Sequence, residues 1–444
     1  MFIIRIYLFF TLFPFFLFSQ DSFELIGSVE KTSLDFEWVN NLIILKVEIN
    51  NVPLNLILDT GVEQTVLINI QTPDTLSLKS VKKKYFTGVG ADNPLISGLS
   101  SAHNKINLSG KIVNNDAHIF LITDVDFYFS EHIGIPIHGF IGGELLKDYW
   151  VEIDYKRRKI HFYHSLSNRK LHKYKAYQLD IVNGKPFVEA YIQTKKESQP
   201  KKIKFLIDTG NSDALWVFSS EKLLISSDHK WIKDFFGLGF SGEISGKRLK
   251  IHKFNFDRKL NFKNIYLALP DSIYFQSVIK KYPFDGLIGN EILRRFKVIF
   301  NYKNQKMYLK KNRAFYYEKF LFNNTGIYLM YDGKIPVKVE KILTTFESID
   351  RGRNSYLSTV TSVVYQYQML DRIVIRYIRK NSPADRAGLM EGDVLLKING
   401  ESVYNYRLDE LEKKFFYKNK EKLTFLINRK GLTLEYKIHN IKQL

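Results

Sequence analysis

The sequence predicts a mainly β protein with two pseudo-symmetric β-barrel lobes followed by a different, α+β domain. Three observations support this fold class: a β-rich unit occurs twice within residues 34–310, each copy carries Asp-Thr-Gly after an apolar run, and the repeat ends near Lys311. The 444 residues are enough for about three domains. We therefore divide the chain into 1–19, a targeting segment; 20–165 and 166–312, the two lobes; and 313–444, the C-terminal domain.

The repeat is defined by glycines at matching distances from two aspartates. Asp59 and Asp208 each begin Asp-Thr-Gly, and they stand 149 positions apart. Two further glycines lie 29 and 31 positions after each aspartate: Gly88 and Gly90 in the first copy, Gly237 and Gly239 in the second. The motifs GFIGGELL and GLIGNEIL follow, and each precedes a strand-turn-strand pattern, at 151–163 and 298–310. Such agreement in spacing indicates two copies of one structural unit.

The segments before the two aspartates predict β-hairpins. In the first copy, alternating β-branched residues surround a turn at Asn50-Asn51 and lead to Asp59. In the second copy the corresponding turn is Asn183-Gly184, and a further strand leads to Asp208. Each aspartate should therefore stand at a strand-to-turn junction. Helices should be short, with 144–149 and 291–296 the best candidates.

The N-terminus predicts export. An apolar run at 6–18 follows Arg5 and precedes Ser19, the pattern of a secretory signal peptide. Leu17 stands where a small residue is preferred at a cleavage site, so an uncleaved anchor remains an alternative. No later run reaches 18 apolar residues, so no further membrane span is expected. We expect a periplasmic or extracellular protein.

Composition excludes several kinds of chemistry. Cysteine is absent, which excludes disulfides, thiol catalysis and Cys-ligated zinc. Lys and Arg outnumber Asp and Glu by 66 to 46, giving a formal charge of +20. No dense basic stripe or nucleic-acid motif accompanies this charge, so we expect scattered surface lysines and no nucleic-acid partner. A basic surface that binds anionic polymers remains a weaker alternative.

Two Asp-Thr-Gly turns can support acid-base chemistry. An aspartate after a buried apolar strand is costly unless its charge is used or shared. Gly61 and Gly210 let the backbone turn tightly, so the two carboxylates can approach each other. Two carboxylates about 3 Å apart cannot both ionise, and they share one proton. Such a pair can activate a water molecule without a metal or other cofactor.

The repeat resembles the aspartic proteases, and more closely the bacterial retropepsin-like group in which two lobes are fused in one chain. Asp-Thr-Gly followed later by two apolar residues and Gly is the pattern of that family, and here it occurs twice, with Phe140-Ile141-Gly142 and Leu287-Ile288-Gly289. The resemblance implies an endopeptidase that hydrolyses polypeptides with a water activated by a catalytic pair. It assigns these residues: Asp59 and Asp208 as the catalytic pair, Thr60 and Thr209 as the lock between the turns with Gly61 and Gly210 beside them, and Gly88, Gly90, Gly237 and Gly239 as flap glycines.

The chain departs from that family pattern directly after the two motifs. Ser or Ala commonly follows Asp-Thr-Gly in the family, whereas Val62 and Asn211 stand here. Val62 offers no side-chain hydrogen bond, so the two carboxylates should be inequivalent. Tyr85 lies near the flap, but its relation to a flap tyrosine is open. A catalytically inactive peptide-binding or scaffold protein of the cell envelope is therefore the alternative function.

Two other motifs carry less weight. Residues 237–242 match G-x-G-x-x-G, but a strand-like run follows where a dinucleotide site needs a helix. We therefore reject a nucleotide site. His161 and His164 fall in the hairpin that closes the first lobe, and no third ligand accompanies them, so we expect no metal site.

The C-terminal domain has its own signature. In SPADRAGLMEGDVLLKINGESV, Ser382 can cap a short helix that starts at Pro383 and ends before Gly388, and a strand follows. This sequence resembles a PDZ domain, in which a peptide adds as a strand and its C-terminal carboxylate binds backbone N–H groups. The resemblance places the peptide-binding loop at Thr325, Gly326 and Ile327. About 30 residues at 341–370 interrupt the pattern and could disturb the groove or form an extra element. A PDZ-like fold that only packs remains the alternative.

Overall fold

A computed structural model describes most of the chain. The described residues are 22–27, 29–70, 73–86, 96–123, 128–219, 221–223, 225, 229–239, 242–275, 279, 284–351, 354–416, 422–439, 441 and 443–444. The predicted targeting segment 1–19 and the glycines Gly88 and Gly90 lie outside them. Within the described part, no helix has the length and apolarity needed to cross a bilayer.

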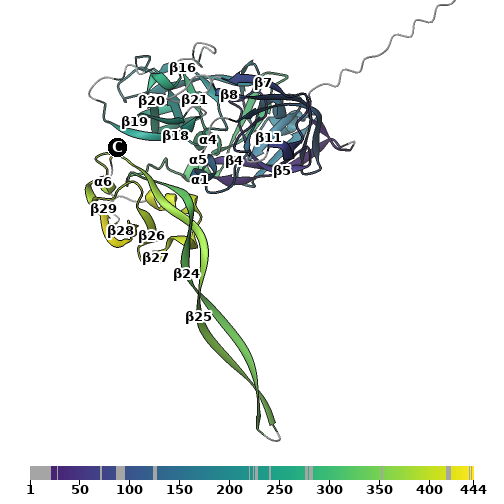
Figure 1. Cartoon of the computed structure of the whole chain (residues 1–444). Coiled ribbons are helices and arrows are strands. Elements are labelled where there is room, and N and C mark those ends of the chain that lie inside the picture. Colours follow the sequence, from purple (N-terminus) through teal and green to yellow (C-terminus); the bar gives the residue numbers. More distant parts are fainter. Residues whose placement is uncertain are drawn as a thin grey trace, which may run out of the picture.

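The architecture is mainly β, as the sequence predicts. Figure 1 shows two β-rich lobes side by side, a smaller C-terminal domain next to them, and a long two-stranded ribbon that projects away from that domain. The described strands form four sheets, one in each lobe, one shared by the lobes and one in the C-terminal domain.

The first-lobe sheet has the strand order β1-β9-β6-β10-β5-β4-β8-β7, with β3 paired to β4. Its strands are β1 (Glu24–Leu25), β3 (Glu37–Val39), β4 (Leu42–Ile49), β5 (Val52–Leu58), β6 (Val66–Leu67), β7 (Lys82–Phe86), β8 (Ile96–Leu108), β9 (Ile112–Ile122) and β10 (Gly139–Ile141). The β4–β5 hairpin turns through Asn50 and Asn51, which both have positive φ, the conformation that Asn tolerates in tight hairpin turns.

The second-lobe sheet repeats this plan in the order β14-β15-β16-β21-β17-β20-β19-β18. Its strands are β14 (Asp180–Val182), β15 (Lys185–Gln193), β16 (Lys201–Ile207), β17 (Leu215–Val217), β18 (Trp231–Gly239), β19 (Gly242–Asn255), β20 (Asn261–Pro270) and β21 (Gly286–Ile288). In both lobes, the short strand from the glycine-rich motif lies parallel to the strand that ends at the Asp-Thr-Gly turn.

The third sheet joins the lobes. It has the order β13-β23-β22-β11-β12-β2, and its centre is an antiparallel pair with one strand from each lobe, β11 and β22. Its strands are β2 (Lys31–Asp35), β11 (Trp150–Asp154), β12 (Lys159–Tyr163), β13 (Lys175–Gln178), β22 (Phe296–Asn301) and β23 (Lys306–Lys311). Because the sheet is continuous, one hydrophobic core extends through both lobes.

The C-terminal sheet contains β24 (Ile327–Arg351), β25 (Asn354–Ile378), β26 (Val394–Ile398), β27 (Glu401–Ser402), β28 (Lys422–Arg429) and β29 (Leu432–His439). It encloses a separate core that includes Leu329, Phe415 and Phe425. The interruption at 341–370 is an extension of β24 and β25 into the ribbon of Figure 1. Large apolar side chains are exposed along the ribbon, with Phe346 at 69% and Tyr367 at 73%.

The helical segments are short, as expected. They are η1 (Pro73–Leu76), α1 (Phe129–Ile133), η2 (Gly143–Leu146), α2 (Asn168–Leu171), η3 (Ser272–Tyr274), α4 (Asn290–Leu293), α5 (Arg313–Tyr317), α6 (Pro383–Ala387), η4 (Val403–Asn405) and α7 (Leu408–Phe415). The Ser382 side chain caps α6 by accepting from the Asp385 N–H, and Gly388 ends it in the left-handed conformation. These details match the sequence prediction.

Candidate active site and its connection to the C-terminal domain

The two lobes deliver their aspartates to one place by the same construction. Strand β5 ends at Leu58, and the Asp59 N–H then donates to the carbonyl of Ile141 on β10 at 2.9 Å. In the second lobe the Asp208 N–H donates to the carbonyl of Ile288 on β21 at 3.0 Å. Each aspartate is therefore held at a strand end by the parallel neighbour that carries the glycine-rich motif.

The threonines of the two motifs link the turns. The hydroxyl of Thr60 donates to the carbonyl of Ile207 at 2.6 Å and accepts from the N–H of Thr209 at 3.1 Å. The hydroxyl of Thr209 donates to the carbonyl of Leu58 at 2.8 Å and accepts from the N–H of Thr60 at 3.1 Å. Both threonines are fully buried. This reciprocal network fixes one turn against the other.

The carboxyl groups of Asp59 and Asp208 meet and form a hydrogen bond to each other. Each also accepts the N–H of the motif glycine, from Gly61 at 2.7 Å and from Gly210 at 2.9 Å. A Cβ at Gly210 would lie 2.4 Å from the Asp59 carboxylate, and one at Gly61 would lie 2.9 Å from the same group. Glycine is therefore required at both positions because the backbone passes so close to the carboxylates.

The pair retains a proton more strongly than an exposed aspartate does. Burial raises the pKa of Asp208 well above its ordinary value, and the negative charge of Asp59 raises it further. Burial also raises the pKa of Asp59, against the lowering effect of the Gly61 N–H. The pair consequently holds one proton above the pH range in which a solvated aspartate loses it, with one carboxyl group as an acid and the other as a base.

Lys185 lies beside the pair, a position that was not predicted from the sequence. Its ammonium group donates to the carbonyl of Gly61, and its charge lowers the pKa of both Asp59 and Asp208. Lys185 begins β15 directly after the turn at Asn183-Gly184, whereas Leu42 begins the corresponding strand β4 after a turn at Asn40-Asn41. The counterpart of Asn183-Gly184 is therefore this turn and not the expected one at Asn50-Asn51. Aligning the two hairpins by their turns shows this change from apolar to cationic, which is the sequence signal that could have found it.

The side chains of the residues after the two motifs contact groups other than the carboxylates. Val62 packs against the apolar cluster of the first lobe. The side-chain oxygen of Asn211 accepts from the N–H of Asp213 at 2.8 Å, so it stabilises its own loop. This placement agrees with the expectation that the Val62 side chain gives the carboxylate no hydrogen bond, while the Val62 backbone N–H lowers the pKa of Asp59.

Of the four glycines predicted to belong to flaps, the two that the structure describes lie on a hairpin of the second lobe. Gly237 and Gly239 are on β18, which pairs with β19, and the pairing shifts register between Phe235 and Gly237. Gly237 has φ of +127°, a conformation that favours glycine. In the first lobe, β7 and β8 form the corresponding hairpin, and Tyr85 on β7 is 68% exposed.

The loop predicted to bind a peptide carboxylate uses its donors internally. The N–H of Gly326 donates to the side chain of Asn323 at 3.0 Å, and the N–H of Ile327 donates to the hydroxyl of Thr325 at 3.3 Å. Thr325 and Ile327 are fully buried. A Cβ at Gly326, where φ is +79°, would lie 2.4 Å from Ser382, so only glycine fits.

Other elements lie against β24 and α7, which adjoin this loop. The carboxylate of Glu412 on α7 accepts from the N–H of Leu329 on β24 at 3.3 Å. Helix α1 of the first lobe packs against the same two elements, because its capping residue Gly134 lies against Leu408 and Tyr331. In this conformation β24 and α7 face part of the first lobe.

A buried carboxylate joins the C-terminal domain to the hairpin of β18 and β19, the predicted flap hairpin. Asp234 on β18 is fully buried and accepts from Arg248 on β19 at 2.7 Å, from Arg379 of the C-terminal domain at 3.1 Å and from the Tyr328 hydroxyl at 2.7 Å. Arg248 also bonds to Asp213 at 2.8 Å. A continuous polar network therefore runs from the C-terminal domain through the flap hairpin to the loop after Asp208.

Aromatic contacts surround that network. The ring of Phe235, on β18, lies 5.5 Å from the rings of both Tyr328 and Tyr377 of the C-terminal domain. On its other side, the ring of His132 from α1 lies 6.3 Å away. Burial lowers the pKa of His132, so the neutral form is favoured at this junction of three domains.

Comparison with known proteins identifies one part of the chain. Residues 374–429 match the PDZ domain family. The C-terminal domain is accordingly called the PDZ domain below. No curated protein matches the sequence. Among solved structures, the chain is similar to the crystal structure of an aspartic proteinase from Irpex lacteus, with 11% identity and a TM-score of 0.40, over 65% of this chain and 99% of that chain.

The remaining sequence candidates also have definite positions. His161 lies on β12, and His164 follows that strand with its ring 5.3 Å from the ring of Tyr149. No group of three His, Asp or Glu side chains in the described residues is arranged to hold a metal ion. Residues 240 and 241 of the G-x-G-x-x-G match lie outside the described part, and strand β19 starts at Gly242.

Proposed function

We propose that the protein is an aspartic endopeptidase in which Asp59 and Asp208 activate water for peptide-bond hydrolysis. The observation that carries the proposal is the pair itself: two carboxylates from sequence-distant repeats share a hydrogen bond inside a threonine network that fixes their geometry. Burying a carboxylate without neutralising its charge costs roughly several kcal/mol. Such a pair is therefore expected where its shared proton is used in a reaction.

The reaction needs only the one proton that the pair holds. The ionised carboxylate takes a proton from water as the water oxygen adds to the peptide carbonyl carbon, and the protonated carboxyl gives its proton to the carbonyl oxygen. The neutral diol then collapses: the leaving nitrogen takes the proton that came from water, and a diol hydroxyl returns one proton to the pair. Products leave with the pair again singly protonated, so no metal or cofactor is required for proton balance.

The PDZ domain would bind polypeptide ends or control access to the active site. Support for the second role comes from the network through Asp234, because this residue belongs to the flap strand and bonds to Arg379 and Tyr328 of the PDZ domain. A ligand that moves the PDZ domain would therefore also move β18. Helix α7, which carries Glu412, and helix α1 would have to move away from β24 before a peptide could add to that strand.

Substitution of the pair tests the activity. Purified protein is incubated with an unfolded protein from pH 3 to pH 8, beside Asp59→Asn, Asp208→Asn and the control Asp180→Asn, whose carboxylate pairs with Lys204 at the surface. The pair variants should lose cleavage by roughly 10²–10⁴-fold, the usual contribution of acid-base groups. The control should retain it. Equal cleavage by all four proteins would show that a contaminant or another site acts.

The alternative function is a peptide-binding envelope protein without catalysis. Val62 and Asn211 favour it, because neither side chain supports the carboxylates. Binding without cleavage by the unsubstituted chain at every pH, together with failure to bind a pepstatin-type inhibitor, would support this alternative over the peptidase.

We also propose that the chain is exported to the periplasm or the extracellular space. The support is the sequence pattern at 1–19. Fractionation of expressing cells and sequencing of the N-terminus of the mature protein test it. Recovery of the full-length chain in the cytoplasmic fraction would contradict export.

A further inference from the structure

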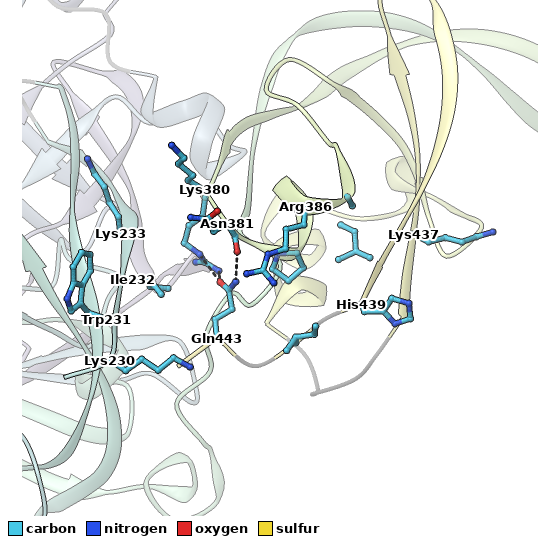
Figure 2. A pocket seen from close by; sticks show the side chains of 15 residues that line it. Lys230, Trp231, Ile232, Lys233, Lys380, Asn381, Arg386, Lys437, His439 and Gln443 are labelled. Carbon is cyan, nitrogen blue, oxygen red and sulfur yellow. Dashed lines mark hydrogen bonds between the residues drawn. The ribbon is translucent and has the colours of Figure 1, made fainter. Parts of the chain in front are cut away.

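A pocket of about 720 Å³ lies between the second lobe and the PDZ domain, away from the aspartate pair. Strand β18 lines one side, while α6, the end of β29 and the chain around Gln443 line the other (Figure 2). Its volume falls within the range of about 300–1,000 Å³ that ligand sites occupy. None of the site residues discussed so far faces it except Arg379, which reaches Asp234 behind the pocket.

The lining is strongly cationic. Six of its fifteen residues are Lys or Arg and none is Asp or Glu. In the whole chain 66 of 444 residues are Lys or Arg and 46 are acidic, so fifteen average residues would include about two of each sign. The cations are Lys230 and Lys233 from the lobe, and Arg379, Lys380, Arg386 and Lys437 from the PDZ domain. The domain arrangement thus brings like charges together from two sides.

Most of these charges are not neutralised within the described residues. Arg379 bonds to Asp234, and Lys437 pairs with Glu435 at 3.0 Å. No described carboxylate forms an ion pair with the other four, Lys230, Lys233, Lys380 and Arg386. Like charges that gather around one pocket repel, and a bound anion would reduce that repulsion.

The shape of the pocket favours an extended chain as the anion. Strand β18 is the last strand of its sheet and β29 is the last of the PDZ sheet, so two sheet edges border the pocket. An extended polypeptide can add to such an edge through its backbone. Trp231, which is 44% exposed, and Ile232 provide apolar surface on the same strand.

We propose that this pocket binds an acidic stretch of polypeptide, with its Asp and Glu side chains between the lobe lysines and Arg386 of the PDZ domain. Strand β18 runs from the pocket at Trp231, through Asp234, to the flap glycines. Occupation of the pocket would therefore hold the PDZ domain against the flap strand. This last consequence rests on the proposed peptidase function, but the binding does not.

Binding is measured first on the Asp208→Asn variant, so that cleavage of the probe peptide cannot interfere with the measurement. The probe is a fluorescein-labelled decapeptide rich in Glu, followed by anisotropy, with the same peptide carrying Gln in place of Glu as its control. We expect the Glu peptide to bind and the Gln peptide to bind at least about tenfold more weakly, with affinity falling as salt rises. Equal binding of the two peptides would overturn the proposal.

Charge reversal locates the site. The triple variant Lys230→Glu, Lys380→Glu and Arg386→Glu should weaken binding about tenfold or more. A matched triple at exposed lysines elsewhere, Lys105→Glu, Lys156→Glu and Lys196→Glu, changes the net charge equally and should bind almost as the parent does. Equal loss in both triples would show that only net charge matters and would overturn the assignment to this pocket. Thermal unfolding of each variant checks that the fold is retained. A triple variant that does not fold is replaced by one that carries Gln at the same three positions.

Three further measurements extend the test, and the first of them separates a polypeptide from a nucleic acid as the source of the anion. A single-stranded oligonucleotide of equal charge should compete less well than the Glu peptide, and stronger competition would overturn the choice of polypeptide. The ligand-dependent change in tryptophan fluorescence should disappear in Trp231→Phe. On the catalytic chain, cleavage of a substrate with an acidic flank should fall in the first triple and not in the matched triple.

Discussion

Removal of the negative charge at Asp234 should destabilise the assembly more than any surface substitution. This carboxylate is fully buried and accepts hydrogen bonds from Arg248, Arg379 and Tyr328. In Asp234→Asn one acceptor oxygen becomes an NH₂ group, so a buried guanidinium loses its partner. Breaking a buried ion pair from one side costs about 3–5 kcal/mol, and we expect the free energy of unfolding to fall by that amount.

Urea unfolding followed by tryptophan fluorescence measures this loss, because Trp216 and Trp231 both belong to the second lobe. The control is Asp35→Asn, since Asp35 pairs with Lys159 at the surface and exposed pairs contribute only about 0–1 kcal/mol. A cycle that combines Asp234→Asn with Arg379→Gln should show coupling of roughly 1–3 kcal/mol. If Asp234→Asn loses no more stability than Asp35→Asn, the network does not hold the domains together and the reasoning is wrong.

Three other predictions follow from the charges and hydrogen bonds of the sites. Lys185→Met removes a cation that lowers the pKa of both aspartates, so the profile of kcat/KM against pH should move to higher pH. An unchanged profile would contradict the role given to Lys185. Burial raises the pKa of Glu412 to about 7, from an ordinary value of 4.5, so its contribution to stability is complete below about pH 4.5 and is lost as the pH rises to 7. In Glu412→Gln the free energy of unfolding should therefore change less across that interval, by up to roughly 3 kcal/mol, and the same slope in both proteins would refute this. Thr209→Val removes two buried hydrogen bonds of the threonine lock, so the free energy of unfolding should fall by about 2–4 kcal/mol and cleavage should decrease. Unfolding curves and single-turnover assays measure the two effects. Retention of full activity would show that the lock does not position the pair.

The fold class was predictable because its signals are local. Strand alternation, the Asn turns before the aspartates and the glycine spacing each depend on residues close together in the chain. The cap of α6 by Ser382 was predictable for the same reason. The meeting of Asp59 with Asp208 was expected from their glycine turns and from the resemblance to two-lobed aspartic proteases, because a repeat alone does not decide whether equivalent turns meet.

The residues that tune the candidate site were less accessible to sequence reasoning. Lys185 lies before Asp208 in the chain and contacts the turn of the other lobe at Gly61, so its position depends on how the lobes join. The burial of the loop at Gly326, with its donors used internally, likewise depends on neighbours such as Asn323 and Ser382. A resemblance could suggest the loop, but it could not show whether its N–H groups were available.

The sequence by itself determined the β-rich lobes, the two aspartate turns and the PDZ pattern, because periodicity, turn residues and motif spacing act over short stretches of chain. Tertiary structure decided the rest: the sheet shared by β11 and β22, the network that ties Asp234 to Arg379, and the cationic pocket between two domains. These features arise where segments far apart in sequence meet, and burial and charge at such contacts are set only once the domains have packed.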